Sequence, residues 1–169
     1  IPGSLVGSEM CIRDSISALQ DMELISVIKD NNLMISLMHM QGVPKNMQDN
    51  PAYDDVVTDV YEYLEKKVQL CVNSGIDKSD IIIDPGFGFG KTLDHNYLLL
   101  NSLKKFTKLG CRILSGISRK SMIGSVINKP PSERLYGSLA ATVLAIRNKA
   151  SILRVHDVRQ TKVLLNFKD

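Results

Sequence analysis

Charged, polar and aromatic side chains follow four apolar stretches of the chain, each at the point where the stretch ends. In chain order these side chains are Met38 and His39, then Asp84 and Phe89, then Ser118, Arg119 and Lys120, and finally Arg154 and His156. If the stretches are strands of one parallel sheet, their carboxyl ends lie on one side of it. We therefore predict that a carboxylate, two guanidiniums, an ammonium, imidazole side chains and an aromatic ring share one binding site.

The segment around Asp84 suggests the shape of the ligand. Asp84 ends the run Ile81–Ile83, and the glycine loop that follows, residues 85–91, has the sequence PGFGFGK. Pro85 disfavours helix at Asp84, and alternating glycines allow a ligand close to the backbone. Two of the chain's four Phe lie in this loop, which indicates a flat aromatic partner. The carboxylate of Asp84 needs donors, and the amino and ring N–H edge of a neutral heterocycle would supply two. The alternative is a βα-turn whose glycines serve geometry and whose Asp84 caps a helix.

Two known phosphate-binding loops do not fit this segment. A P-loop requires glycine five residues before Gly90, where Pro85 stands, and a dinucleotide-binding fingerprint requires glycine at Lys91. Further along, Arg154 and His156 fall on the same side of a strand because side chains alternate. This placement favours a joint task for the two cationic side chains.

The elements that would position these groups alternate between strand and helix. We expect about five strands, which end near residues 17, 38, 84, 116 and 155. Helices are predicted over residues 22–31, 53–74, 95–108, 122–127, 132–148 and 158–167. Gly75 and Gly110 are expected to end two of the helices, and serines to cap the helix at 122–127.

Helices between all the strands require a parallel sheet, which predicts an α/β fold. A complete eight-stranded barrel takes roughly 250 residues. We therefore predict a partial (β/α)8 TIM barrel, with about the last five βα units and without the first strands. A small open doubly wound sheet is the alternative, but it would concentrate polar residues at one switch point rather than at every strand end.

Composition excludes several classes of protein. A chain of 169 residues suffices for one domain with a core, and a net charge of +3 gives no argument for a nucleic-acid partner. No apolar run approaches the roughly 18 residues of a membrane span. The chain has three cysteines, Cys11, Cys71 and Cys111. They are too widely spaced for a disulfide framework or a zinc site, and this favours a reducing cytoplasm.

The first residues differ from the rest of the chain. Residues 1–13 show neither helical nor strand periodicity and no signal-peptide pattern, so we expect a foreign or unstructured stretch there. Residues 14–169 would then form the single domain.

Four motifs in this order resemble the dihydropteroate synthase family, whose fold is a pterin-binding (β/α)8 barrel of folate biosynthesis. They are LMHMQGVPKNM at 37–47, DPGFGFGK at 84–91, SRKSMIG at 118–124 and RVHD at 154–157. The resemblance covers residues 16 to 165. It implies condensation of 6-hydroxymethyl-7,8-dihydropterin diphosphate with 4-aminobenzoate, giving 7,8-dihydropteroate and pyrophosphate.

The resemblance also implies roles for individual residues. Asp84 would bind the pyrimidine edge of the pterin, and Lys120 would donate to the pterin. Arg154 would lie against the pterin ring and, with His156, hold the diphosphate. Lys120, Arg154 and His156 would form the catalytic set, in which the protein mainly orients reactants and stabilises charge.

Further site residues follow from the same resemblance. Met38 would line the pterin pocket, whereas Phe89 and Ser118 would border aminobenzoate. The pterin-contacting Asn of the family falls on Asp14, which offers only acceptors where an amide offers both kinds. Mg²⁺ would assist departure of pyrophosphate, but the family's metal-linked Asn belongs to the missing first strands. Sulfonamide-type analogues of aminobenzoate and a homodimeric intact enzyme are likewise implied.

Three other interpretations stay open at this point. The chain could be a non-catalytic pterin-binding module, or the pterin-binding domain of a folate-dependent methyltransferase, or a stand-alone half-barrel. The residue-by-residue match at 118–121 and 154–157 favours a synthase. A half-barrel would expose strand edges, so we expect this polypeptide alone to be poorly stable and inactive.

Overall fold

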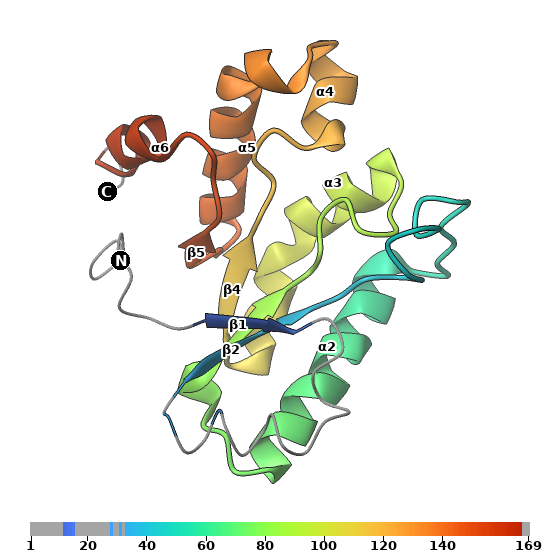
Figure 1. The fold of residues 1–169 in the computed structure, drawn as a ribbon, viewed down its shortest axis with the longest axis vertical. Coiled ribbons are helices and arrows are strands. Elements are labelled where there is room, and N and C mark those ends of the chain that lie inside the picture. Colours follow the sequence, from blue (N-terminus) through green and yellow to red (C-terminus); the bar gives the residue numbers. More distant parts are fainter. Residues whose placement is uncertain (1–11, 16–27, 29–30, 32, 167–169) are drawn as a thin grey trace.

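Five parallel strands form the sheet of the computed structural model, which describes residues 12–15, 28, 31 and 33–166 (Figure 1). The strands are β1 (Ile12–Ser15), β2 (Met34–Met38), β3 (Ile81–Asp84), β4 (Arg112–Ser115) and β5 (Ile152–Leu153). Each strand pairs with its predecessor in the sequence, so the order is β1-β2-β3-β4-β5. This order is that of consecutive barrel units, whereas a doubly wound sheet would reverse it at a switch point. The predicted α/β fold is confirmed.

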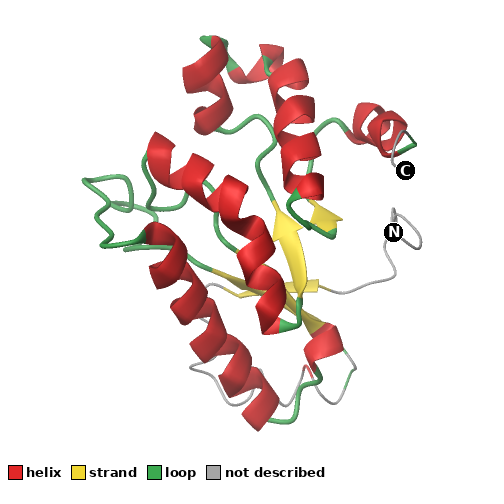
Figure 2. Ribbon diagram, turned by 180° about the vertical axis from the view of Figure 1, so that it is seen from behind, coloured by secondary structure: helices red, strands yellow, loops and turns green. Residues whose placement is uncertain are grey.

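The helices lie between the strands, as the sequence predicts. The α-helices are α2 (Val56–Asn73), α3 (Leu93–Ser102), α4 (Ser121–Ile127), α5 (Leu135–Arg147) and α6 (Val158–Leu165). The 3-10 helices are η2 (Lys78–Asp80), η3 (Leu103–Leu109) and η4 (Pro131–Glu133). Helices α2 and α3 lie side by side across one face of the sheet (Figure 2). None of the helices in the described residues has the length and apolar character needed to cross a bilayer.

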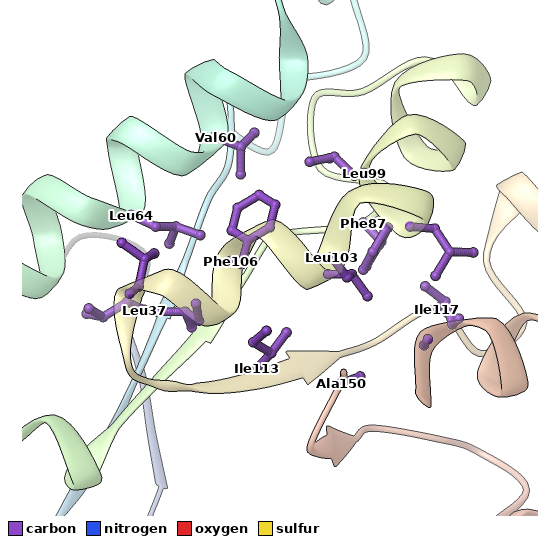
Figure 3. Close-up of a cluster of buried hydrophobic side chains, with 14 of the residues drawn as sticks. Leu37, Val60, Leu64, Phe87, Leu99, Leu103, Phe106, Ile113, Ile117 and Ala150 are labelled. Carbon is purple, nitrogen blue, oxygen red and sulfur yellow. The ribbon is translucent and has the colours of Figure 1, made fainter. Parts of the chain in front are cut away.

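The main core lies between the sheet and these helices (Figure 3). Because side chains alternate along a strand, β2 and β3 send Leu37 and Ile83 toward the helices. There they join Leu64 and Phe106, both fully buried, in one apolar cluster. Alternation leaves the opposite face to a smaller cluster of Met34, Ile82 and Leu114. The same alternation places Met38 and Asp84, paired across β2 and β3, beyond that smaller cluster at the strand ends.

Several predicted boundaries differ in detail. The helix expected at 95–108 changes from α to 3-10 geometry at Leu103, before Gly110 ends it with φ +73°. The helix expected at 132–148 opens with the separate turn η4. The predicted serine cap of α4 is wrong: Lys120 occupies the N-cap and makes no side-chain capping bond. Gly75, at φ +84°, follows the end of α2 as predicted.

The N-terminal predictions fall largely outside the described residues. Strand β1 takes Ile12 and Arg13 into the sheet, where they pair with Met34 and Ile35, although both belong to the stretch 1–13 set aside above. The strand end expected near residue 17 is not among the described residues. Of the helix expected at 22–31, only Ile28 and Asn31 are described, and Ile28 is helical and buried.

The helix-facing core gives a first prediction. Replacing Leu64, which is fully buried on α2, by Ala should lower the free energy of unfolding by about 2–5 kcal/mol, because a cavity forms. Leu70→Ala on the same helix is the control, since Leu70 is 49% exposed, and it should change that free energy by less than about 0.5 kcal/mol. Urea unfolding followed by circular dichroism measures both. Equal midpoints for the two variants would contradict this account of the core.

Candidate active site

Asp84 is a buried carboxylate at the carboxyl end of β3. Its side chain is 4% exposed, and its Oδ1 accepts the N–H of Gly86 at 2.8 Å. Burial raises the pKa of Asp84, while the Gly86 N–H and then the positive charges of Lys120, Arg154 and Lys91 lower it. The structure therefore gathers three cations around this carboxylate. A buried carboxylate is a strong acceptor for a ligand's N–H groups.

The glycine loop is shaped by the chain's own backbone. Gly86 and Gly90 have φ of +72° and +63°, in the left-handed region that favours glycine. A Cβ on Gly86 would lie 1.8 Å from the carbonyl oxygen of His39, and one on Gly90 would lie 2.6 Å from that of Gln41. At these two positions the geometric interpretation holds, because the group that comes close is the β2–α2 loop and not a ligand.

The two phenylalanines of the loop have different roles. Phe87 is fully buried in the core, so the expectation that it faces a flat partner is wrong. Phe89 stays half-buried, and the Nζ of Lys120 lies 4.5 Å from the centroid of its ring, a cation–π distance. The same Nζ donates to the carbonyl oxygen of Phe87. Phe89 is thus the one of the two that offers an accessible ring, and it does so beside Lys120.

Lys120 stands in a partly desolvated position. Burial lowers the pKa of Lys120 to about 8; the charge of Asp84 opposes this shift, and the charge of Arg154 adds to it. Met38 also joins this corner, since β2 and β3 place it directly opposite Asp84. The backbone N–H of Arg154 donates to Ser115 O at 3.0 Å, continuing the β4–β5 pairing by one residue.

The last residue of the glycine loop, Lys91, is a buried lysine that the sequence did not predict as a site residue. Lys91 is 3% exposed, and its Nζ lies 2.9 Å from His39 Nδ1 and 3.0 Å from each of two carbonyl oxygens, those of Gly86 and Phe89. Burial lowers the pKa of Lys91 to about 7, with Asp84 opposing and Lys120 adding to the shift. Burial, then the charge of Lys91, lowers the pKa of His39 to about 3. His39 is therefore neutral, and its Nδ1 shares a hydrogen bond with the Nζ of Lys91.

Other polar side chains complete the support of the loop. Gly88 donates its N–H to Asn96 Oδ1 at 2.7 Å and accepts from Gln48 Nε2 at 2.5 Å. The hydroxyl of Tyr53 donates to Gly90 O at 2.7 Å. Together with Lys91, these bonds fix the loop from the β2–α2 side and from helix α3. The sequence offers only a weak signal for these supporting residues, namely that they are polar and that some of them lie near the glycine loop.

Ser118 and His156 contact each other at the next pair of strand ends. The Ser118 Oγ accepts the backbone N–H of His156 at 3.2 Å and lies 3.1 Å from its Nδ1. Ser118 is buried, and His156 and Arg154 are exposed at the rim. The Asp14 backbone pairs with Ser36 in the sheet, but its side chain lies outside the described residues.

The sequence matches a known family over most of its length. Residues 6–156 match the family described as pterin binding enzyme. The chain belongs to the pterin-binding enzymes. It is 45% identical over 156 residues to the dihydropteroate synthase of Haemophilus influenzae, a match that covers 92% of this chain and 57% of that protein.

Solved structures of pterin-binding enzymes agree with this assignment. The dihydropteroate synthase of Yersinia pestis, solved as a sulfonamide drug complex, superposes with a TM-score of 0.86 at 42% identity, covering 92% of this chain and 57% of that one. The enzyme of Xanthomonas albilineans in complex with 7,8-dihydropteroate gives a TM-score of 0.82 at 37% identity, covering 92% and 56%. The chain spans about half the length of the curated relatives it matches.

The resemblance inferred from the four motifs is therefore confirmed at the level of the pterin-binding family. The structure brings Asp84, Lys120 and Arg154 close enough for their charges to interact, and places Phe89 against Lys120. The individual roles of these residues toward a ligand stay predictions.

The buried Lys91 gives a prediction about pH. An unfolded lysine titrates near pH 10.4, so between about pH 7 and pH 10 the unfolded state binds more protons than the folded state. Stability should therefore rise with pH over this window, by as much as about 1.4 kcal/mol per pH unit for the Lys91 contribution. In Lys91→Met this contribution should be absent, and unfolding in urea between pH 7 and pH 9 measures the difference.

The exposed Lys66 on α2 gives the matched control, since Lys66→Met removes the same charge. The slope for Lys66→Met should follow that of the original chain. If Lys91→Met kept the original slope as well, Lys91 would not be the source of the rise.

Proposed function

We propose that this chain is the substrate-binding part of a dihydropteroate synthase, which joins 6-hydroxymethyl-7,8-dihydropterin diphosphate to 4-aminobenzoate. The observation that carries the proposal is the buried Asp84 carboxylate at a strand end, surrounded by three cations and adjoined by the Phe89–Lys120 pair. The relatives at 45% and 47% identity are dihydropteroate synthases, which supports the same reaction.

The pterin would bind at the Asp84 corner. The amino group and ring N–H of its pyrimidine edge would donate to the Asp84 carboxylate, which also accepts the N–H of Gly86. Lys120 would donate to the pterin as well, because an ammonium has three protons and the Phe87 carbonyl takes one. Met38, opposite Asp84, would line the pocket. The ligand thereby supplies the partners that a buried carboxylate requires.

The diphosphate and the aminobenzoate would lie further out. Arg154 and His156 are exposed at the rim on the side of Lys120, where cationic side chains can hold phosphate oxygens. Phe89 and Ser118 would border the aminobenzoate. The Ser118 hydroxyl would share its hydrogen-bonding capacity between His156 and that ligand.

The reaction would then need orientation and charge stabilisation from the protein. The amine nitrogen of aminobenzoate attacks the pterin methylene carbon, the carbon–oxygen bond to the diphosphate breaks, and the amine loses a proton. Arg154, His156 and Lys120 would stabilise the charge that grows on the departing pyrophosphate. Holding both reactants in one cavity lowers the entropic part of the barrier.

Magnesium would bind together with the substrate. No group of three or more His, Cys, Asp or Glu side chains within the described part of the chain could hold a metal ion. The described residues therefore do not fit a protein-held metal site. The Mg²⁺ ion would be bound by diphosphate oxygens and by groups outside these residues.

Two further aspects of the intact protein are proposed with it. It would act as a homodimer, which would cover apolar side chains exposed on α5 and α6, such as Tyr136 and Val163. It would work in the cytoplasm, since Cys71 and Cys111 are free thiols.

The first test uses a hybrid enzyme, in which residues 12–169 replace the matching part of the Haemophilus influenzae relative. Lys120→Ala in the hybrid should weaken pterin binding about tenfold to a hundredfold, because a charged hydrogen-bond donor is lost. Lys104→Ala is the control, since Lys104 is exposed on η3. Calorimetry measures both affinities, and unchanged binding in Lys120→Ala would remove Lys120 from the site.

A second test compares the hybrid with this polypeptide alone. The hybrid should form dihydropteroate, whereas the polypeptide alone should form none and should unfold readily, because β1 and β5 each leave an edge of the described sheet unpaired. Product formation is followed by chromatography. Turnover by the isolated polypeptide would contradict the need for the other half.

A further inference from the structure

Arg119 lies between two predicted site residues, and its side chain pairs with Asp157. Its Nε lies 3.0 Å from Asp157 Oδ2 and its Nη2 lies 2.5 Å from Asp157 Oδ1, a two-point contact of guanidinium with carboxylate. Arg119 lies between Ser118 and Lys120, and Asp157 follows His156. The pair therefore connects the loop after β4 to the loop after β5.

The backbone at Arg119 is held in an unusual conformation. Its φ is +57°, a region that residues other than glycine adopt at a cost. The surroundings fix it: its N–H donates to Ser138 Oγ at 2.9 Å, and its carbonyl oxygen accepts from Arg134 Nη1 at 2.9 Å. Such a conformation persists only where several contacts determine it, as they do here.

Asp157 is committed to the same contact. It occupies the N-cap position of α6, where an Asp side chain usually accepts backbone N–H groups of the helix, but it makes no such bond. Its carboxylate is turned to Arg119, and the hydrogen bonds from Arg119 lower the pKa of Asp157. The Asp157 side chain is only 12% exposed and that of Arg119 is 32% exposed, so the pair is partly shielded from water.

We propose that Arg119 and Asp157 form a clamp of two positioning residues that sets the spacing between Lys120 and the pair Arg154 and His156. The Ser118–His156 contact lies beside the clamp and links the same two loops. This inference rests on the proposed function, in which Lys120 holds the pterin while Arg154 and His156 hold its diphosphate. Neither clamp residue needs to touch the substrate.

A double-mutant cycle in the hybrid enzyme tests the clamp. Arg119→Met and Asp157→Asn should each lower kcat/KM about tenfold, and the double variant should lose no more than the worse single variant. The control cycle uses Lys129→Met and Glu133→Gln, because this ion pair, at 2.9 Å, is exposed and joins no two site loops. The control variants should stay within about twofold of the original hybrid.

A second measurement separates positioning from general loss of structure. The clamp variants should weaken binding of the pterin diphosphate more than binding of 6-hydroxymethylpterin, which lacks the diphosphate. A general loss of structure would weaken both ligands equally. Arg119→Lys should restore part of the affinity, since it keeps the charge and loses the two-point geometry.

Hydrogen exchange keeps the clamp testable without turnover. Peptides covering residues 116–121 and 153–158 should exchange faster in Arg119→Met and Asp157→Asn than in the control variants. If the unmutated hybrid neither binds nor turns over, the proposed function fails, and exchange alone decides the clamp. Equal exchange in clamp and control variants, or additive losses that affect both pterins alike, would overturn the clamp.

Discussion

The burial of the Asp84 carboxylate is the constraint on which the site depends. Removing a carboxylate from water is costly unless hydrogen bonds and opposite charges compensate. Here the compensation comes from the Gly86 N–H and from three cations on three different loops. Lys91 comes from the end of the glycine loop, Lys120 from the loop after β4, and Arg154 from the end of β5. The buried charge of Asp84 is therefore compensated only when the ends of β3, β4 and β5 lie close together.

The conformation of the glycine loop allows these groups to come together. Its left-handed glycines allow the β2–α2 loop to pass within contact distance, and the Lys91 ammonium then bonds His39 and two loop carbonyls. The same conformation sends Phe87 into the core and leaves Phe89 beside Lys120. Core packing and site geometry are thus consequences of the same few backbone angles.

The sheet explains why the cationic groups can be shared between loops. Parallel strands in sequential order bring successive βα loops next to each other, so contacts such as Ser118–His156 and Arg119–Asp157 join neighbouring loops directly. The two residues of each contact are 38 positions apart in the sequence but adjacent in the structure. The cationic side of the site therefore behaves as a unit built from two loops.

Local patterns in the sequence determined much of this protein. The run Ile81–Ile83, the alternation of strand and helix, and the glycines at 75 and 110 predicted the parallel sheet and most helix limits, because these features depend on near neighbours. Four motifs predicted the family. The tertiary structure alone decided that Lys91 is buried, that Phe87 belongs to the core, and that Arg119 pairs with Asp157. Each of these outcomes depends on contacts between residues distant in the chain, which periodicity and propensity do not describe.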